Sequence, residues 1–501
     1  MNNLTLFQFF HWYYSTEGNL WLHASDKAEE LASMGITHVW LPPAYKSAFG
    51  TEEPGYAVYD LYDLGEFDQK GSVRTRYGTR QEYQDCIDRL HQENIQVLAD
   101  IVLNHRHGAD EKESFPARKV DPYNRTEFVL EEEIIEAWTK FNFPGRNGRY
   151  SEFVWDWRSF TGISEDPEHI YLIHNDHTNG QWDYVMEEEF GNYDYLMGAD
   201  VEFRNPFVRE ELFNWGKWYM ESTKVDGFRL DAVKHIPHDF FNEWLDHLRQ
   251  HFDNDFLCIG EYWSADTGLL LQYIDATAGK MQLFDVPLHF NFHRASTSDE
   301  GFDMSTILHN SLVESKPDLA ITFVDNHDTQ PLQSLQSPVD YWFKPHAYAI
   351  ILLRESGLPC IFYPAMYEAK YVDHKDGEEV YVELNTVPGL ENLIRVRKDF
   401  AYGKQRDYFD HPSTVGWTRE GITEKDGSGC AVVLTNGAAG AKAMEIGKQH
   451  AGKNFVDIYG QCGETVINED GWADFPVRDR SISVWINKEG LAFFPGLDSN
   501  S

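Results

Sequence analysis

Three carboxylic acids lie at the ends of three separate apolar runs, and their type and placement suit one kind of chemistry. Asp231 lies in DGFRLDAVKH, Glu261 in FLCIGEYW and Asp328 in TFVDNHDTQ. If these runs are parallel strands of a barrel, their carboxyl ends share one rim and the acids converge there. An ionised carboxylate and a protonated carboxyl roughly 5 to 5.5 Å apart are what retaining glycoside hydrolysis requires.

The residues beside the first two acids favour different protonation states. Strand alternation places Arg229 and Asp231 on one face, where the guanidinium would lower the pKa of Asp231 and keep it ionised as a nucleophile. Glu261 precedes Tyr262 and Trp263, and apolar surroundings would favour its protonated form, as a general acid needs. The alternatives are a structural salt bridge and an ordinary acid at a strand end.

Two further loops carry polar residues at strand ends. Asp328, beside His327, can bind sugar hydroxyls and help to distort the ring, although an Asn-His-Asp loop could instead cap a helix or bind a metal. The third strand ends in LADIVLNHRHG, with Asp100, Asn104 and His105 at the rim. We expect His105 to donate to a sugar hydroxyl and Asn104 to supply an amide oxygen to calcium.

Other oxygen donors could complete that calcium site. Asp194 and Asp200 lie in GNYDYLMGAD, and the backbone carbonyl of His235 could join them from the barrel. Calcium binds six to eight such oxygens. Taken singly, each of these acids could equally be a solvated loop residue.

Eight short apolar or β-branched runs alternate with amphipathic segments. The runs are residues 4–10, 37–41, 96–102, 225–230, 256–260, 282–286, 320–324 and 358–363. Segments with helical spacing lie between them, such as 21–34, 80–94, 205–223 and 239–251. This alternation predicts an α/β fold, a (β/α)8 TIM barrel, which would position all of the acids.

The barrel is expected to carry two additions. About a hundred residues separate the third and fourth strands, far more than an ordinary connection, which predicts an inserted β-rich domain at the rim. Short alternating runs after the last helix predict a C-terminal antiparallel β-sandwich. The expected domains are 1–104 with 205–395 for the barrel, 105–204 for the insertion, 396–488 for the sandwich and 489–501 for a tail.

Composition excludes several classes of protein. A formal net charge of -39 argues against nucleic acid or an anionic membrane as a partner. Five scattered cysteines without CxxC spacing indicate reduced thiols rather than a disulfide framework or a zinc site. The N-terminus lacks the pattern of a signal peptide, and no apolar run has transmembrane length. We therefore expect a cytoplasmic protein, with the mature form of a secreted enzyme as the alternative.

Taken together, these segments resemble the α-amylase family of glycoside hydrolases, family 13. DIVLNH, GFRLDAVKH, the glutamate of IGEYW and FVDNHD match its four ordered signature regions, and LMGAD matches a fifth. The resemblance covers nearly the whole chain, including FHWYY, VWLPPAYK and RSISVW. Within the family it is similar to the bacterial liquefying type, and most of all to the cytoplasmic enterobacterial branch.

The resemblance implies a specific reaction on starch, glycogen or maltodextrin. This is endo-hydrolysis of α-1,4-glucan with retention, through a covalent glycosyl-enzyme on Asp231, with Glu261 as acid then base and Asp328 as stabiliser. The implied substrate-binding residues are Arg229, His327, His105, Tyr56, Lys234, His235, Asp100 and Trp263. Calcium would join the insertion to the barrel through Asn104, Asp194, Asp200 and the His235 carbonyl, and Asp183 is a retained metal-ligand position of the further acids that relatives carry in the insertion. We expect a monomer.

Departures from the family pattern bear on the metals. Relatives often carry a linked calcium-sodium-calcium cluster, but Thr161 stands where an aspartate is expected, and Glu202 and Arg204 replace two more. One calcium site is therefore expected, with the second calcium and the sodium weakened or absent. A third site, near the C-terminal domain, is in doubt because Arg406 and Cys430 replace its histidine and aspartate.

Two other functions compete with this interpretation. One is a different family-13 enzyme, such as a cyclomaltodextrinase, an α-glucosidase or a transglycosylase, although the Lys234-His235 pair favours an amylase. The other is a non-catalytic carbohydrate-binding relative. Such relatives carry a membrane anchor and lose the acids, whereas this chain keeps all three carboxylates.

Overall fold

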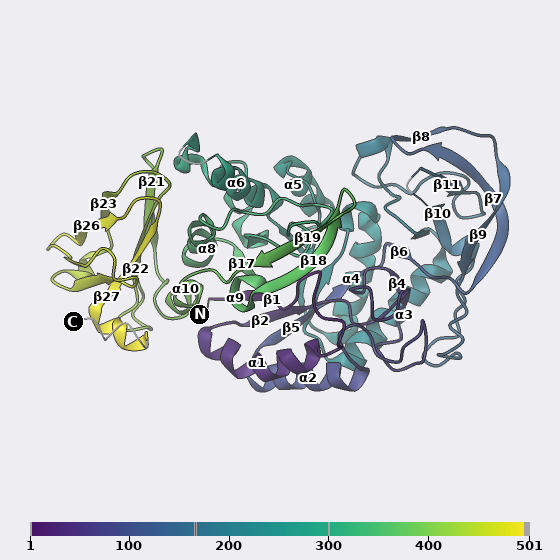
Figure 1. Cartoon of the computed structure of the whole chain (residues 1–501), viewed down its shortest axis with the longest axis horizontal. Coiled ribbons are helices and arrows are strands. Elements are labelled where there is room, and N and C mark those ends of the chain that lie inside the picture. The colour runs from purple at the N-terminus through teal and green to yellow at the C-terminus, as the bar shows by residue number, and fades with distance from the viewer. Residues whose placement is uncertain (1–2, 165, 167, 299–300, 495–501) are drawn as a thin grey trace.

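The computed structural model describes residues 3–164, 166, 168–298 and 301–494 (Figure 1). Eight parallel strands close into a barrel in the order β1, β2, β5, β13, β14, β15, β16, β17. Their bounds are β1 Leu6–Gln8, β2 His38–Leu41, β5 Gln96–Ile101, β13 Gly227–Leu230, β14 Leu257–Gly260, β15 Gln282–Phe284, β16 Ala320–Phe323 and β17 Leu358–Phe362. Each falls within one of the eight predicted runs, and the predicted barrel is confirmed.

Helices surround the barrel, and most bury one face, whereas α8 is buried at every position from His346 to Leu353. They are α1 Leu20–Met34, α2 Arg80–Gln92, α3 Pro206–Thr223, α4 His238–Phe252, α5 Thr267–Ala276, α6 Val286–Thr297, α7 Leu312–Ser315, α8 Lys344–Leu353, α9 Pro364–Tyr367 and α10 Leu390–Asp399. The local sequence determines where several of these helices begin. Thr79 and Glu82 form a capping box on α2, and Asn205 caps α3 ahead of Pro206. None of the described helices is both long and apolar enough to cross a membrane.

The segment between β5 and β13 forms its own sheet. Its strands are β6 His105–Arg106, β7 Glu111–Asp121, β8 Asn124–Phe128, β9 Glu133–Lys140, β10 Phe160–Ser164, β11 Ile170–Ile173 and β12 Ala199–Val201. Figure 1 places this sheet at the opposite end of the molecule from the C-terminal sheets. The antiparallel pairing of β12 with β6 sets Asp200 opposite His105, so the end of the insertion returns to its beginning.

Two short antiparallel pairs also flank the barrel. One joins β3 Lys46–Ser47 to β4 Val58–Asp60, just after Tyr56. The other is the hairpin of β18 Ala369–Lys375 and β19 Glu378–Leu384. Because this hairpin follows the carboxyl end of β17, it belongs to the same rim as the insertion.

The C-terminal part is built from two antiparallel sheets that enclose a separate apolar cluster. One sheet has the order β20, β21, β22, β27, β24, β25, and the other pairs β23 with β26. The bounds are β20 Gln405–Tyr408, β21 Thr414–Arg419, β22 Cys430–Thr435, β23 Gly440–Glu445, β24 Asn454–Asp457, β25 Glu464–Val466, β26 Trp472–Val477 and β27 Ile482–Asn487.

The predicted tail begins with ordered structure. Residues Lys488–Phe493 form a 3-10 helix, and Phe494 is buried with its ring stacked on Phe400, the centroids 6.0 Å apart. Residues 495–501 of that predicted tail lie outside the described residues.

Candidate active site

A single buried guanidinium joins the acids at the carboxyl ends of the strands. Arg229, on β13, is 1% exposed. Its Nη1 lies 2.6 Å from Asp231 Oδ1 and 2.9 Å from Asp100 Oδ1. Its Nη2 lies 3.0 Å from Glu261 Oε2. Three carboxyl groups that are far apart in the sequence therefore share one positive charge.

Burial dominates the protonation of this cluster. It raises the pKa of Asp231 and of Glu261 above their ordinary values, and the charge of Arg229 opposes the shift in both. It also raises the pKa of Asp328 well above its usual range, reinforced by the charge of Glu261. The sequence expectation that Arg229 would leave Asp231 with a lowered pKa is therefore wrong in sign. Desolvation raises the pKa of Asp231 by more than the charge of the shared guanidinium lowers it.

The order of ionisation still follows from the contacts. One positive charge cannot keep every neighbouring carboxyl ionised, since like charges in a low-dielectric site disfavour one another. Asp231 has the shortest contact with Arg229, so it is the group that the guanidinium favours most as a carboxylate. Glu261 meets the same guanidinium at the longer distance of 3.0 Å, so its carboxylate gains less from Arg229.

A strained turn links the nucleophile candidate to the acid candidate. Ala232, directly after Asp231, has a φ of 51°, in the left-handed region. Its N–H donates to Glu261 Oε2 at 3.0 Å. An alanine in this conformation costs roughly 1–2 kcal/mol, which the surrounding barrel must offset. No signal in the sequence marks this turn.

The loop after β16 presents Asp328. Asn326 Oδ1 accepts from the backbone N–H groups of Asp328 and Thr329, both at 2.9 Å, which fixes the turn. His327 Nε2 lies 3.4 Å from Asp328 Oδ2. The histidine ring stacks on Tyr56, with centroids 5.1 Å apart and planes 13° apart. An aromatic wall thus stands beside the third acid.

A cavity of ≈ 230 Å³ opens above these groups. Predicted residues that line it are Asp231, Glu261, Asp328, Tyr56, His105, Lys234, His235, Trp263 and His327. Arg229 and Asp100 do not line it. They lie beneath it, where Asp100 accepts from Tyr56 Oη at 2.9 Å and from Trp40 Nε1 at 3.0 Å. These two residues support the cavity floor rather than forming its surface.

Several lining residues were not singled out from the sequence. They are Trp12, Tyr193, Leu196, Met197, Ala232, Ser334 and Leu335. Trp12 stacks on Tyr56, with centroids 5.4 Å apart. Its position just beyond the carboxyl end of β1 is a signal that could have identified it. Tyr193, Leu196, Met197 and Ala232 lie inside the signature segments GNYDYLMGAD and GFRLDAVKH, which is a signal of the same kind. Ser334 and Leu335 come from a loop whose course the sequence does not indicate.

Two of the histidines that line the cavity, His105 and His235, are neutral and contact backbone carbonyls. His105 Nε2 lies 2.9 Å from the Tyr56 carbonyl oxygen, and His235 Nδ1 lies 2.7 Å from that of Tyr193. Burial lowers the pKa of His105 to about 4 and that of His235 to about 3. Donation from His105 to a sugar would therefore compete with an existing bond.

Lys234 lies between the barrel and the insertion. Its Nζ is 3.9 Å from Glu187 Oε2 and 3.7 Å from Glu189 Oε2, and it sits over the Tyr193 ring at 4.8 Å. This contact draws the segment around Tyr193 over one side of the cavity.

The predicted calcium ligands gather where the insertion meets the barrel. Asn104 Nδ2 lies 3.3 Å from Asp200 Oδ1, and Asp194 Oδ2 accepts from the Asp183 N–H at 2.8 Å. Burial raises the pKa of Asp194 and Asp200 well above the usual range, and neighbouring acids add to the shift. The described residues contain no group of three or more His, Cys, Asp or Glu side chains close enough to hold a metal by themselves.

The chemistry of the unpaired atoms nevertheless suits a hard cation. Among the residues that the structure describes, Asn104 Oδ1, Asp183 Oδ2 and Asp200 Oδ2 are buried and have no hydrogen-bond partner. Unpartnered buried oxygens are costly, and calcium prefers carboxylate and amide oxygens of this kind. These residues therefore fit the predicted ion when amide and backbone oxygens are counted with the carboxylates.

Arg204 occupies the acidic part of the same cluster. Its Nε lies 2.7 Å from Glu202 Oε1 and its Nη2 2.6 Å from Glu202 Oε2. Its Nε is also 3.7 Å from Asp183 Oδ2. The guanidinium of Arg204 is thus the counter-ion of the fully buried Glu202. Near the C-terminal domain, Asp407 is similarly engaged with Arg354, at 2.8 and 3.0 Å.

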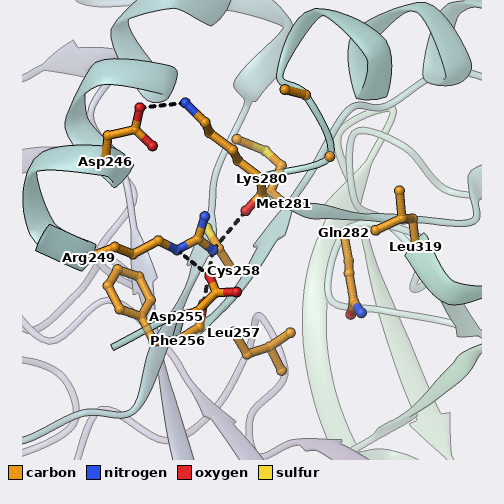
Figure 2. A pocket seen from close by; sticks show the side chains of 12 residues that line it. Asp246, Arg249, Asp255, Phe256, Leu257, Cys258, Lys280, Met281, Gln282 and Leu319 are labelled. Carbon is orange, nitrogen blue, oxygen red and sulfur yellow. Dashed lines mark hydrogen bonds and ion pairs between the residues drawn. The ribbon is translucent and has the colours of Figure 1, made fainter. Parts of the chain in front are cut away.

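A second, larger hollow has different chemistry. It measures ≈ 480 Å³ and lies at the amino-terminal end of β14 and β15, where Arg249 meets Asp255 and Lys280 meets Asp246 (Figure 2). Both cations are already paired, and none of the three candidate catalytic acids lies there. The cavity at the carboxyl-terminal rim is therefore the candidate active site.

Family models match most of the chain. The model described as "Alpha amylase, catalytic domain" matches residues 23–388, and the one described as "Alpha-amylase C-terminal" matches residues 431–486.

Curated relatives match nearly end to end. The chain is 47% identical to the α-amylase of Geobacillus stearothermophilus, over 97% of this chain and 87% of that protein. It is 45% identical to the cytoplasmic α-amylase of Escherichia coli (strain K12), over 98% of this chain and 100% of that one. Among solved structures, the α-amylase of Geobacillus thermoleovorans complexed with acarbose has a TM-score of 0.63 at 17% identity, covering 97% of this chain and 98% of that chain, a likeness of fold alone.

Proposed function

The chain belongs to the α-amylase family of glycoside hydrolases, and from that premise we propose how its own side chains carry out the reaction. It is a glycoside hydrolase that cleaves internal α-1,4-glucosidic bonds of starch-type glucans. The observation that carries the proposed mechanism is the contact of one guanidinium with both Asp231 and Glu261, at 2.6 and 3.0 Å.

Asp231 is the nucleophile. Its carboxylate, favoured by Arg229, attacks the anomeric carbon while the protonated Glu261 gives its proton to the glycosidic oxygen, and the leaving chain departs. In the second half of the reaction the Glu261 carboxylate takes a proton from water, which attacks the same carbon and releases Asp231. Two inversions at one carbon give net retention.

The remaining residues bind and orient the sugar. Asp328 and His327 face the ring at the cleaved bond, and Tyr56 with Trp12 provides an aromatic surface for it. Lys234, held toward the insertion, contacts the leaving side. Trp263 lines the same cavity, whereas Arg229 and Asp100 act from beneath it.

Calcium is proposed as a structural ion. Asn104, Asp183, Asp194, Asp200 and the His235 carbonyl would hold it between insertion and barrel. When bound, it neutralises buried carboxylates and fixes the segment that carries Tyr193 over the cavity. One calcium is proposed, because Arg204 already supplies positive charge to Glu202.

We propose that the enzyme acts in the cytoplasm as a monomer. Support comes from the 45% identity to a relative named as cytoplasmic. The five cysteines are unpaired, and four of them are buried, which suits a reducing compartment.

The product time course tests the proposal. We expect wild-type enzyme to reduce starch viscosity rapidly and to release mixed maltooligosaccharides, also from a glucan blocked at its non-reducing end. Glu261→Gln should abolish both activities. Release of glucose or maltose alone, with the blocked chain untouched, would indicate an exo-acting relative. Full activity in Glu261→Gln would remove its role as the acid.

A further inference from the structure

Gln8 reaches His327 from the first strand of the barrel. It is the last residue of β1 and is 0% exposed. Its Nε2 lies 3.0 Å from His327 Nδ1, whereas its Oε1 has no hydrogen-bond partner among the described residues. The amide of a residue far away in the sequence is thus committed to the ring beside Asp328.

The opposite nitrogen of the ring faces the reaction centre. His327 Nε2 lies 3.4 Å from Asp328 Oδ2, and both residues line the cavity. Burial and the charge of Arg229 lower the pKa of His327 well below its ordinary value, so the ring is neutral. A neutral imidazole donates from one nitrogen and accepts at the other. The protonation state of Nδ1 therefore determines whether Nε2 is a hydrogen-bond donor or an acceptor.

We propose that Gln8 is a positioning residue that fixes the tautomer of His327 by donating from its amide to Nδ1. The single ring proton then lies on Nε2, directed at Asp328 and at the sugar hydroxyls that enter the cavity. This inference rests on the proposed roles of Asp328 and His327. It adds that a residue which does not line the cavity determines the hydrogen-bond donor at its surface.

The surroundings of the ring offer few competing proton sites. Its charged or titratable neighbours are Asp328, Arg229 and Tyr56, and its other aromatic neighbours are Phe10, Trp12 and Trp40. Tyr56 stacks face to face with the ring, and its hydroxyl already donates to Asp100. Among the described residues, this leaves Gln8 as the hydrogen-bond partner of Nδ1.

Two substitutions test the N–H donor of Gln8 while keeping the volume of its side chain nearly unchanged. In Gln8→Glu the ionised carboxylate only accepts, so at a pH where it is ionised Nδ1 must carry the proton and Nε2 presents a lone pair toward Asp328. We expect kcat to fall roughly 10- to 100-fold, as for other residues that orient a functional histidine, with a smaller change in KM. Compared with wild type at the same pH, the deficit should shrink as the pH falls, because a proton on the introduced carboxyl or on the ring restores Nε2–H. In Gln8→Met the volume is kept and the donor is lost, so activity falls without that recovery.

Gln282→Met provides a matched control. Gln282 is also a barrel-strand glutamine with a buried, unpartnered oxygen, but it lies in the hollow of Figure 2, at the other end of the barrel. It should keep wild-type kcat, KM and pH profile. If both Gln8 variants also keep the wild-type profile, the proposal is wrong. It is equally wrong if Gln8→Glu is fully active and Gln8→Met is not, since the amide oxygen would then be the operative atom.

A direct measurement does not depend on the folding of the Gln8 variants. The 15N shifts of His327 in the wild-type enzyme, assigned by difference from His327→Asn, should show a protonated Nε2 and an unprotonated Nδ1. The opposite tautomer would overturn the proposal. An inactive Asp328→Asn together with the opposite tautomer rejects only the role of Gln8, whereas a fully active Asp328→Asn rejects the proposed reaction centre itself.

Discussion

At the scale of single residues, one guanidinium sets the charge balance of the site. Arg229 meets Asp100 and Asp231 through Nη1 and Glu261 through Nη2. A fork of donors can contact groups on three strands at once, which a point charge cannot. The proposed reaction needs one of these acids ionised and another protonated. The difference between their pKa values therefore depends on which acid lies closer to Arg229.

The pH dependence of kcat follows from this arrangement. Asp231 must be ionised, so activity falls as pH drops through its folded pKa, and Glu261 must be protonated, so activity falls as pH rises through its own. Burial raises both pKa values, and we expect a bell-shaped profile displaced above the ordinary carboxyl range. A profile that remains flat down to the ordinary pKa of aspartate would contradict this.

Arg229→Lys tests the shared guanidinium. With a single ammonium in place of the fork, the carboxylate of Asp231 loses stabilisation, its pKa rises further, and the acid limb of kcat moves to higher pH. We expect kcat at the optimum to fall on the order of 10²-fold, as when one aligned donor is lost. Arg354→Lys, at the paired Asp407 far from the cavity, is the control and should leave the acid limb in place.

At the scale of elements, the turn after β13 stores strain where the two proposed catalytic groups, Asp231 and Glu261, meet. Because Ala232 has a φ of 51°, Ala232→Gly should relieve about 1 kcal/mol and raise the unfolding free energy. In contrast, Ala295→Gly in the buried interior of α6 should lower it by roughly 0.5–1 kcal/mol. Denaturant titration measures both. Equal signs for the two variants would show that the turn is not strained.

The insertion should depend on the proposed calcium ion. Asn104 and Asp200 present buried oxygens that have no hydrogen-bond partner among the described residues, so chelation of calcium should lower the thermal midpoint and loosen the sheet containing β12. Titration of chelated protein should reveal one tight calcium, and Asp200→Asn should weaken it at least tenfold. Two tight calcium ions would contradict the role given to Arg204. Asp407→Asn, whose carboxylate Arg354 already holds, is the control and should leave calcium affinity unchanged.

At the scale of the whole molecule, barrel and C-terminal sheet share one apolar cluster. One face of that sheet, including Trp417, packs into the same core as the barrel helices. The Trp417 indole donates to the carbonyl of Leu353, at the end of α8, at 3.2 Å. Domains joined by a continuous core are expected to unfold together.

Trp417→Ala tests that coupling. Removing a fully buried indole should cost about 3–5 kcal/mol and shift a single calorimetric transition, rather than splitting off an early C-terminal one. Trp472→Ala, at a residue that is 38% exposed, should change the midpoint much less. Two separated transitions in the Trp417 variant would mean that the barrel folds independently of the sheet.

Local pattern determined the elements. The eight strands were predictable because each is a short, buried run bounded by helical periodicity, and that information lies within a few residues of each strand. The three acids were predictable because parallel strands of a closed barrel must bring their carboxyl ends to one rim. The capping residues of α2 and α3 were equally local.

Contacts between segments that are far apart in the sequence could not be predicted. The contact of Gln8 with His327, the shared guanidinium and the packing of Trp12 on Tyr56 join segments that are adjacent only after the barrel has closed. The direction of the Asp231 pKa shift was missed for the same reason. An arginine two residues away is visible in the sequence, but the loss of water around both groups is a property of the assembled core. The sequence by itself thus determined which groups are available and on which strands they end, while tertiary structure decided their protonation and their partners, because burial and non-local contacts exist only in the folded chain.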